Sequence, residues 1–326
     1  MKVLVNKPIH PAALERLKQE TQVLTPYTAT HDEIVELLPE IDGLLLCAGF
    51  DVGPQEIKHA PKLRVIGRHG VGLDNVDLQA ATAHRLPVVY TPYGPTESTA
   101  EHAFLLMLAA ARRLSILDRA TRTGDFDIRN RAQSMGIELK GKALGVVGFG
   151  RIGQRLAQMC RVALEMSICV FDPYLDPEPV TEWGAVPFDS LVELARQVDV
   201  LSLHIPATSE THHLIDRQVI SALKPSAILV NAARGAVLDE AALVEALQAG
   251  RLHSAGIDVY DPEPPTADNP LFRIDRVVLT PHIASKTEEA RTLMGLTVVE
   301  DMVRVLSGQK PHYLANPEVW QSRRFA

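Results

Sequence analysis

Residues 143–153 read ALGVVGFGRIG, an apolar run followed by three glycines at the spacing GxGxxG. The run predicts a buried strand, and the apolar side chains after the last glycine recur at helical spacing. In this strand–turn–helix context, Gly148 permits a sharp turn, Gly150 lets the backbone approach a pyrophosphate, and Gly153 lets the helix pack on the strand. The helix N-terminus offers N–H groups and partial positive charge to phosphates. The stretch therefore predicts a parallel α/β sheet with a dinucleotide site.

An acidic residue follows at the distance that this motif requires. Asp172 ends the next predicted strand, about twenty residues after Gly153. A carboxylate at this position accepts hydrogen bonds from the adenosine ribose hydroxyls and repels a 2′-phosphate, and the following Pro173 and Tyr174 provide no arginine to bind that phosphate. The pattern favours NAD over NADP. A glycine-rich turn with Asp172 as a helix cap is the alternative interpretation.

Short apolar runs alternate with helical stretches along the chain, which predicts parallel β-α-β units. Predicted strands of a first series are residues 2–5, 43–47, 63–67 and 87–91, with helices at 11–20, 31–38 and 75–84. Predicted strands of a second series are residues 144–148, 168–172, 198–204, 227–232, 255–259 and 277–280, with a helix at 239–249. Long helices are expected at residues 96–122, as a bridge, and at 287–306. Two α/β domains are the natural interpretation.

Composition limits the classes of function. The chain has 326 residues, which suggests two domains of about 150 residues each. Its net charge of −7 suggests that it has no nucleic-acid partner. The longest apolar run, residues 103–111, is about half of what a membrane helix needs. No apolar leader precedes the first strand, so we expect neither a membrane anchor nor a signal peptide. Three cysteines without a CxxC pair favour a reducing, cytoplasmic location.

Three chemically active side chains each follow a predicted strand of the second series. Arg234, Glu263 and His282 lie just past strand ends, where ligands gather in a doubly wound sheet. Taken singly, a surface arginine, a solvated acid and a core histidine are the simpler interpretations. Taken together beside a dinucleotide loop, they predict a shared active-site crevice. A second glycine-rich stretch, GRHGVG at residues 67–72, lacks the third motif glycine and predicts an anion-binding nest instead.

Six motifs, in order, resemble the D-isomer-specific 2-hydroxyacid dehydrogenases, a family that includes phosphoglycerate dehydrogenase and the hydroxypyruvate and glyoxylate reductases. They are GFGRIG at 148–153, VFDPY at 170–174, HIPATSETHHLI at 204–215, LVNAARG at 229–235, AGIDVYDPEP at 255–264 and LTPHIAS at 279–285. Residues 67–77 resemble the family's substrate loop. The resemblance implies an NAD domain, residues 99–289, inserted into a substrate domain of residues 1–98 and 290–326. It also implies a homodimer through the NAD domains, with residues 112–139 as an arm.

The resemblance implies a role for each active-site residue. Arg234 would hold the substrate carboxylate and polarise the adjacent carbonyl. His282 would donate a proton to the carbonyl oxygen, and Glu263 would orient the imidazole and favour its charged form. Backbone N–H groups at Val71 and Gly72 would complete the carboxylate site. The residues expected to contact the cofactor are Thr99, Gly148, Gly150, Arg151, Ile152, Gly153, Asp172, Ile205, Pro206, Thr211, Ala232, Arg234, Asp258, His282 and Ala284.

The expected activity is NAD-dependent reduction of a small 2-keto acid or oxidation of the D-2-hydroxy acid. Glyoxylate and hydroxypyruvate are favoured, since Cys47 stands where phosphoglycerate-specific members often carry arginine; Arg68 leaves 3-phosphoglycerate open. An NAD-sensing corepressor-like scaffold is the alternative from another class. No metal is expected, because HExxH spacing is absent and His212-His213 are interpreted as loop residues. The YxxxK pair of short-chain dehydrogenases is also absent.

Overall fold

The computed structural model describes residues 1–325, which form two compact units. One unit contains residues 1–95 and 286–325, and the other is the continuous segment Thr96–Ser285. Each unit has its own parallel sheet, which confirms the predicted α/β class with two sheets. None of the helices within residues 1–325 is both long and apolar enough to cross a bilayer.

The first unit has a five-stranded parallel sheet in the order β2-β1-β3-β4-β5. Its strands are β1 (Lys2–Val5), β2 (Gln22–Leu24), β3 (Gly43–Leu46), β4 (Val65–Arg68) and β5 (Val88–Val89). Its helices are α1 (Pro11–Glu20), α2 (His31–Leu37), α3 (Pro54–His59), α4 (Leu78–Ala83) and α12 (Glu288–Leu306). The central strands are buried on both faces, which explains why they are continuous apolar runs in the sequence.

The helix α12 completes this unit although it is far from the strands in sequence. It packs on β4, where Gly67 leaves room for it: a Cβ at Gly67 would lie 2.2 Å from the sulfur of Met302. Val298 and Met302 are fully buried in the same cluster as strand residues of β1 and β3. The two separate chain segments therefore share one hydrophobic core.

The second unit has a seven-stranded parallel sheet in the order β12-β11-β10-β9-β6-β7-β8. Its strands are β6 (Ala143–Val147), β7 (Ser167–Phe171), β8 (Val186–Pro187), β9 (Val200–Leu203), β10 (Ile228–Asn231), β11 (Ser254–Ile257) and β12 (Val277–Leu279). The chain leaves β6 toward β7 and β8, then returns to the other side of β6 as β9. The switch point of this doubly wound sheet therefore lies between β6 and β9, where ligands of such sheets bind.

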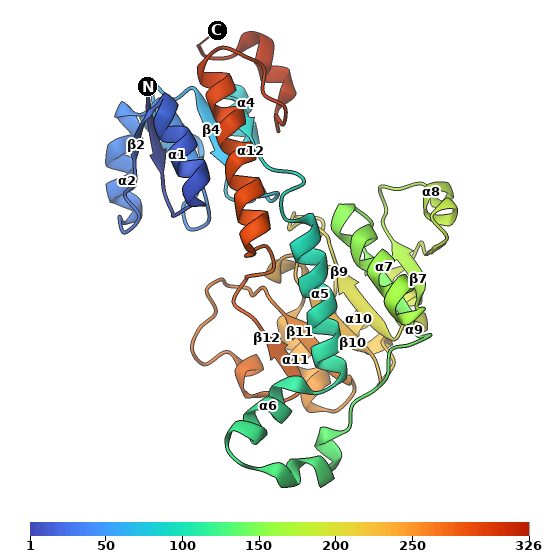
Figure 1. The fold of residues 1–326 in the computed structure, drawn as a ribbon. Coiled ribbons are helices and arrows are strands. Elements are labelled where there is room, and N and C mark those ends of the chain that lie inside the picture. Colours follow the sequence, from blue (N-terminus) through green and yellow to red (C-terminus); the bar gives the residue numbers. More distant parts are fainter. Residues whose placement is uncertain (326) are drawn as a thin grey trace. The chain divides into compact units, whose positions relative to one another are not determined.

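Helices cover both faces of the second sheet. Its helices are α5 (Thr96–Ala111), α6 (Leu114–Arg122), α7 (Arg151–Leu164), α8 (Pro177–Glu182), α9 (Leu191–Gln197), α10 (Arg217–Ala222) and α11 (Glu240–Gln248). One core cluster joins α5 and α7 to the sheet, and a second joins α9, α10 and α11 to it. Figure 1 shows α5 and α7 side by side across the strands.

Several predicted elements differ from the observed ones. The predicted single helix at residues 96–122 was wrong: it breaks between α5 and α6 at Arg113, whose backbone is left-handed with φ of 58°. The Arg113 guanidinium donates to the His253 carbonyl at 2.7 Å, a tertiary contact that sequence periodicity does not reveal. The edge strands β2 and β8 were not predicted, because two or three residues give too short a pattern.

Candidate functional site

The glycine loop after β6 has the local geometry that the motif requires. Gly148 has φ of +89°, and a Cβ there would lie 2.7 Å from the His204 carbonyl oxygen. A Cβ at Gly153 would lie 2.3 Å from the Gly148 carbonyl oxygen, so α7 packs too closely for any other residue. A Cβ at Gly150, by contrast, would meet nothing within 4 Å among the described atoms. This open backbone at the start of α7 is where a pyrophosphate can approach, and the loop fits a dinucleotide.

Asp172 is fixed beside this loop at the carboxyl end of β7. Its Oδ2 accepts a hydrogen bond from the Phe149 N–H at 2.9 Å, and its Oδ1 accepts one from the Tyr174 N–H at 3.1 Å. The Tyr174 hydroxyl donates in turn to Glu210 Oε2 at 2.7 Å. Two carboxylates therefore belong to the segments that flank the expected adenosine position, which adds negative charge against a 2′-phosphate.

The segment after β9 lies across the switch point from the glycine loop. Ile205 and Pro206 follow the strand, and Thr211 closes the turn behind them. The Thr211 hydroxyl donates to the Pro206 carbonyl at 2.7 Å and accepts from the Thr208 N–H at 2.8 Å. Thr99, another residue expected to contact the cofactor, is buried on α5.

The loop after β10 carries Arg234 and is held from two sides. The Asn231 amide donates to the Arg234 carbonyl at 2.9 Å and accepts from the Ala233 N–H at 3.1 Å. Gly235 packs against the loop after β11, since a Cβ there would lie 1.9 Å from the Tyr260 carbonyl oxygen. The structure thus brings the segment of Arg234 into contact with the segment that leads to Glu263. The buried Ala232 lies at the base of the same loop.

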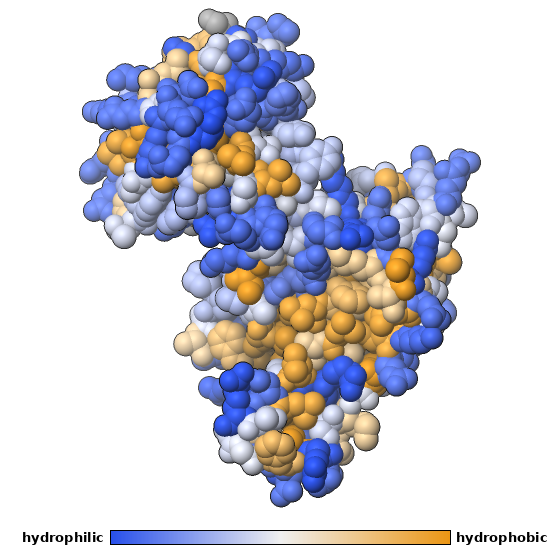
Figure 2. All heavy atoms as spheres, in the orientation of Figure 1, coloured by the Kyte–Doolittle hydropathy of each residue, from blue (hydrophilic) through white to orange (hydrophobic). Residues whose placement is uncertain are grey.

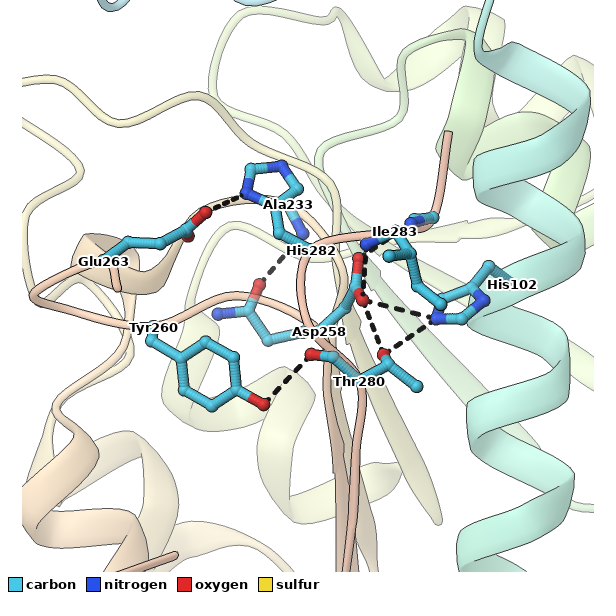
Figure 3. A network of polar contacts seen from close by, with 10 residues as sticks. His102, Ala233, Asp258, Tyr260, Glu263, Thr280, His282 and Ile283 are labelled. Carbon is cyan, nitrogen blue, oxygen red and sulfur yellow. Dashed lines mark hydrogen bonds and ion pairs between the residues drawn. The ribbon is translucent and has the colours of Figure 1, made fainter. Parts of the chain in front are cut away.

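Glu263 and His282 form a hydrogen-bonded pair. The distance between Glu263 Oε1 and His282 Nδ1 is 2.5 Å, and about two fifths of each side chain is exposed. Figure 3 shows the imidazole bound to Glu263 through one ring nitrogen. With Nδ1 engaged by the carboxylate, Nε2 is the ring nitrogen left to exchange a proton with a ligand. This is the orienting arrangement that a general acid requires.

The same loop is organised by a buried carboxylate, Asp258, at the end of β11. Asp258 is fully buried and accepts hydrogen bonds from Ile283 N–H and Ala284 N–H, both at 3.0 Å, and from the Thr280 hydroxyl at 2.5 Å. Burial alone would raise the pKa of Asp258, but these donors and His102 outweigh it and hold the pKa below its ordinary value. Both carboxylate oxygens already have protein partners, so the expected contact of Asp258 with the cofactor remains a prediction.

The lowered pKa predicts a pH-dependent stability. The ionised Asp258 carboxylate stabilises the fold above the ordinary pKa of 3.8, and this contribution is lost as the pH falls through the lowered pKa. We expect the melting temperature of Asp258→Asn to lie below that of the wild type at neutral pH, by about 2–4 °C for each kcal/mol of unfolding free energy lost. This difference in melting temperature should close in acid. Thermal melts across this range measure it, and a gap of constant size would contradict it.

One cluster of metal-ligating side chains occurs in this unit. Ligand atoms of His212, His213 and Asp261 lie within 4.8 Å of one another, and all three residues are exposed. The two imidazoles are stacked, with centroids 4.1 Å apart and planes at 23°. An imidazole binds metal along its ring plane, and planes stacked this way do not meet at one metal position. The expectation that no metal is bound stays a prediction.

The expected substrate loop belongs to the first unit. Val71 is 37% exposed, and neighbouring Gly70 is tied to the segment after β5 through its N–H, which donates to the Thr91 hydroxyl at 2.9 Å. The Arg68 guanidinium donates to Asn75 at 2.9 Å, which fixes the two ends of the loop together. Burial raises the pKa of the nearby Cys47 thiol to about 11, so it is a neutral group.

Sequence reasoning did not single out three residues of the observed network. His102, Tyr260 and Thr280 all connect to the loop that carries His282, and Figure 3 shows them around Asp258. The signal for His102 was weak, since it follows the polar first turns of α5 and directly precedes the apolar run at residues 103–111. Its partner Thr280 is far away in the sequence, so no spacing rule connects the two.

Parallel strands, a glycine loop at the switch point and a carboxylate after the next strand define a dinucleotide-binding domain. Residues 104–284 match the family model described as "D-isomer specific 2-hydroxyacid dehydrogenase, NAD binding domain". The chain belongs to the D-isomer specific 2-hydroxyacid dehydrogenase family, and residues 104–284 are its NAD-binding part.

Named relatives differ in activity. The chain is 42% identical over 313 residues to D-3-phosphoglycerate dehydrogenase of Archaeoglobus fulgidus. This alignment covers 94% of this chain but only 58% of that protein. It is 39% identical over 295 residues to glyoxylate reductase of Thermococcus litoralis, covering 89% of this chain and 88% of that protein. The crystal structure of TT0316 from Thermus thermophilus has a TM-score of 0.89 at 37% identity, covering 97% of this chain and 100% of that one.

Proposed function

We propose that this chain is an NAD-dependent oxidoreductase that interconverts a 2-keto acid and a D-2-hydroxy acid. The reaction consumes a 2-keto acid, NADH and a proton, and yields the 2-hydroxy acid and NAD. The observation that carries the proposal is the Glu263–His282 pair in a dinucleotide-binding unit whose adjoining loop carries Arg234. Family membership and the names of the relatives support it.

Each residue has a separate task in the proposed reaction. When bound, NADH supplies the hydride that reduces the substrate carbonyl carbon. Arg234 holds the substrate carboxylate with paired guanidinium donors, so the carbonyl has one orientation. His282 Nε2 donates a proton to the carbonyl oxygen as that oxygen gains negative charge, and accepts the proton in the reverse direction. Glu263 fixes the ring through Nδ1 and stabilises the positive charge of the protonated imidazole.

Glyoxylate or hydroxypyruvate is our proposed substrate. A half-buried, neutral Cys47 thiol in the first unit does not bind a phosphate as a guanidinium does. The alternative, 3-phosphoglycerate, is supported by the 42% identity to a phosphoglycerate dehydrogenase and by Arg68 in the expected substrate loop. A cytoplasmic location also stays a prediction.

A substrate panel tests this proposal. Consumption of NADH is followed with glyoxylate, hydroxypyruvate, pyruvate, phenylpyruvate and 3-phosphohydroxypyruvate at matched concentrations. We expect the highest kcat/KM with glyoxylate or hydroxypyruvate. A clear preference for 3-phosphohydroxypyruvate would replace the proposed substrate with the alternative. Tight NADH binding with no turnover of any acid would favour a cofactor-sensing scaffold over an enzyme.

Asp172 is the proposed determinant of cofactor choice. Removing its carboxylate in Asp172→Ala takes away the ribose contact and the repulsion of a 2′-phosphate, so we expect the NADH preference to narrow by about tenfold or more, as for a lost charge-assisted hydrogen bond. The measurement is the ratio of dissociation constants for NADH and NADPH from cofactor fluorescence. An unchanged ratio would show that Asp172 does not contact the ribose. Asp176→Ala, an exposed acid in the next turn, is the matched control.

We propose that the chain forms a homodimer through its NAD-binding unit. Exposed apolar side chains lie on α5 and α7, where Leu105 is 53% and Val162 78% exposed. Figure 2 shows apolar residues gathered over these two helices. The segment of residues 112–139, proposed as the arm, carries exposed apolar Leu114, Phe126 and Met135. Exposed apolar side chains gathered on one surface are typical of a protein–protein interface.

A charged substitution in this surface tests the dimer. A dimer of the chain with Leu105→Asp and Val162→Asp would have to bury both new carboxylates of each chain in the interface. We therefore expect this variant to be a monomer at concentrations where the wild type is a dimer. Light scattering coupled to gel filtration measures the mass. Leu293→Asp, a half-exposed leucine on α12 of the other unit, should leave the dimer intact. A doubly substituted chain that stays dimeric would place the interface elsewhere.

A further inference from the structure

A buried polar chain leads from α5 to the loop that carries His282. The His102 side chain is only 12% exposed, and its Nε2 lies 2.9 Å from the Thr280 hydroxyl and 3.5 Å from Asp258 Oδ1. The Thr280 hydroxyl lies 2.5 Å from the same carboxylate oxygen. Figure 3 shows these three side chains converging between the loop and the helix that carries His102, away from the Glu263–His282 pair.

The direction of the hydrogen bonds follows from the chemistry of the groups. An ionised carboxylate only accepts, so the single hydroxyl proton of Thr280 points to Asp258. The Thr280 oxygen is then an acceptor toward His102, and His102 must carry its proton on Nε2. The chain therefore runs from the His102 N–H to the Thr280 hydroxyl, and from that hydroxyl to the Asp258 carboxylate.

Asp258 in turn shapes the backbone around His282. Its carbonyl accepts the His282 N–H at 2.7 Å, and its carboxylate accepts the next two N–H groups along the chain, those of Ile283 and Ala284. His282 has a left-handed backbone with φ of 51°, a conformation that a non-glycine residue adopts only where its surroundings hold it. Three consecutive N–H groups bound to one buried residue provide that hold.

We propose that His102 and Thr280 are positioning residues for the proposed reaction: they orient the Asp258 carboxylate, which holds residues 282–284 in the turn that presents the His282 imidazole. They act through Asp258 and touch neither substrate nor the reacting atoms. This inference rests on the proposed function only for its effect on turnover. Its structural part, the hold on the turn, is measurable without substrate or cofactor.

The first readout is hydrogen exchange of the backbone amides in residues 280–286. Loss of the His102 donor or of the Thr280 hydroxyl lets the carboxylate rotate, so the Ile283 and Ala284 amides should exchange faster. We expect this in His102→Leu and Thr280→Val. Thr280→Ser, which keeps the hydroxyl, should retain wild-type protection, and so should His102→Gln, whose amide N–H reaches the position of Nε2–H.

The second readout is turnover of the 2-keto acid by the same variants. Because a misplaced catalytic group costs up to about 100-fold in rate, we expect His102→Leu and Thr280→Val to lower kcat by about 10- to 100-fold. His102→Gln and Thr280→Ser should recover most of that loss. His84→Leu makes the same chemical change at an exposed histidine of the other unit and should have no effect.

The outcomes separate this inference from the proposed function. Wild-type amide protection and kcat in both His102→Leu and Thr280→Val would overturn the inference. A folded His102→Gln that loses as much amide protection and kcat as His102→Leu would also overturn it. The hydrogen-bond donor at position 102 would then not be the cause of the effect. If His102→Leu does not fold, the comparison of Thr280→Val with Thr280→Ser decides. A wild-type chain without turnover contradicts the proposed function and leaves the exchange experiment valid.

Discussion

His282→Ala should reduce turnover of the 2-keto acid by about 10² to 10⁴-fold, the contribution typical of a positioned general acid. The reason is the geometry of the pair: Glu263 occupies Nδ1 at 2.5 Å, which leaves Nε2 to give its proton to the carbonyl oxygen in the proposed reaction. Removing the ring leaves water to donate the proton. Most of the loss should appear in kcat. NADH affinity, measured by fluorescence titration, should change far less.

The pair itself offers a graded comparison. Glu263→Gln keeps a hydrogen-bonding partner for Nδ1 but removes the negative charge, so we expect a smaller loss than in His282→Ala. His84→Ala, at an exposed histidine of the first unit, controls for the loss of an imidazole as such. If His282→Ala turned over at a rate near that of the wild type, His282 would not be the acid. A loss in His84→Ala of the same size would show an unspecific effect.

Arg234→Lys should lower kcat/KM for the 2-keto acid although it keeps the positive charge. A lysine offers one ammonium where the guanidinium offers a planar pair of donors that matches a carboxylate. A hydrogen bond to a charged group contributes about 1.5–3 kcal/mol, so we expect a decrease on the order of 10- to 100-fold. Initial rates over a range of substrate concentrations measure it, and Arg234→Ala should be at least as slow.

A surface arginine of the same unit provides the control for Arg234. Arg217 on α10 pairs with the exposed Glu245 and has no proposed role in binding the substrate or the cofactor. Arg217→Lys should therefore retain wild-type kcat/KM. Equal activity of Arg234→Lys and the wild type would show that the bidentate contact does not form, and the proposed binding of the substrate carboxylate would have to move to another group.

Much of the fold could be predicted because parallel strands buried on both faces give continuous apolar runs. The runs at residues 2–5 and 143–147 coincide with β1 and β6, and the helix after the glycine loop begins at Arg151. The break between α5 and α6 could not be predicted, because the contact from Arg113 to His253 that fixes it is tertiary. Local pattern also fails for β8, two residues at a sheet edge.

The candidate site shows the same division between local and distant information. Gly148, Gly150 and Gly153 were identified from their spacing, since each role is local to one strand and one helix. The pairing of Glu263 with His282 was expected from a family resemblance, and the structure places the two in hydrogen-bond contact. The hydrogen bond between His102 and Thr280 joins residues that are 178 positions apart in the sequence, and no periodicity reveals such a contact.

The most direct test of the proposed activity follows the hydrogen atom itself. The wild-type chain is incubated with hydroxypyruvate and NADH that carries deuterium at the reactive nicotinamide position, and the product is analysed by chiral chromatography and mass spectrometry. We predict D-glycerate with one deuterium on its second carbon, and a strong loss of that product in His282→Ala. An L-configured product, or D-glycerate formed without deuterium, would contradict an NAD-dependent D-2-hydroxyacid dehydrogenase.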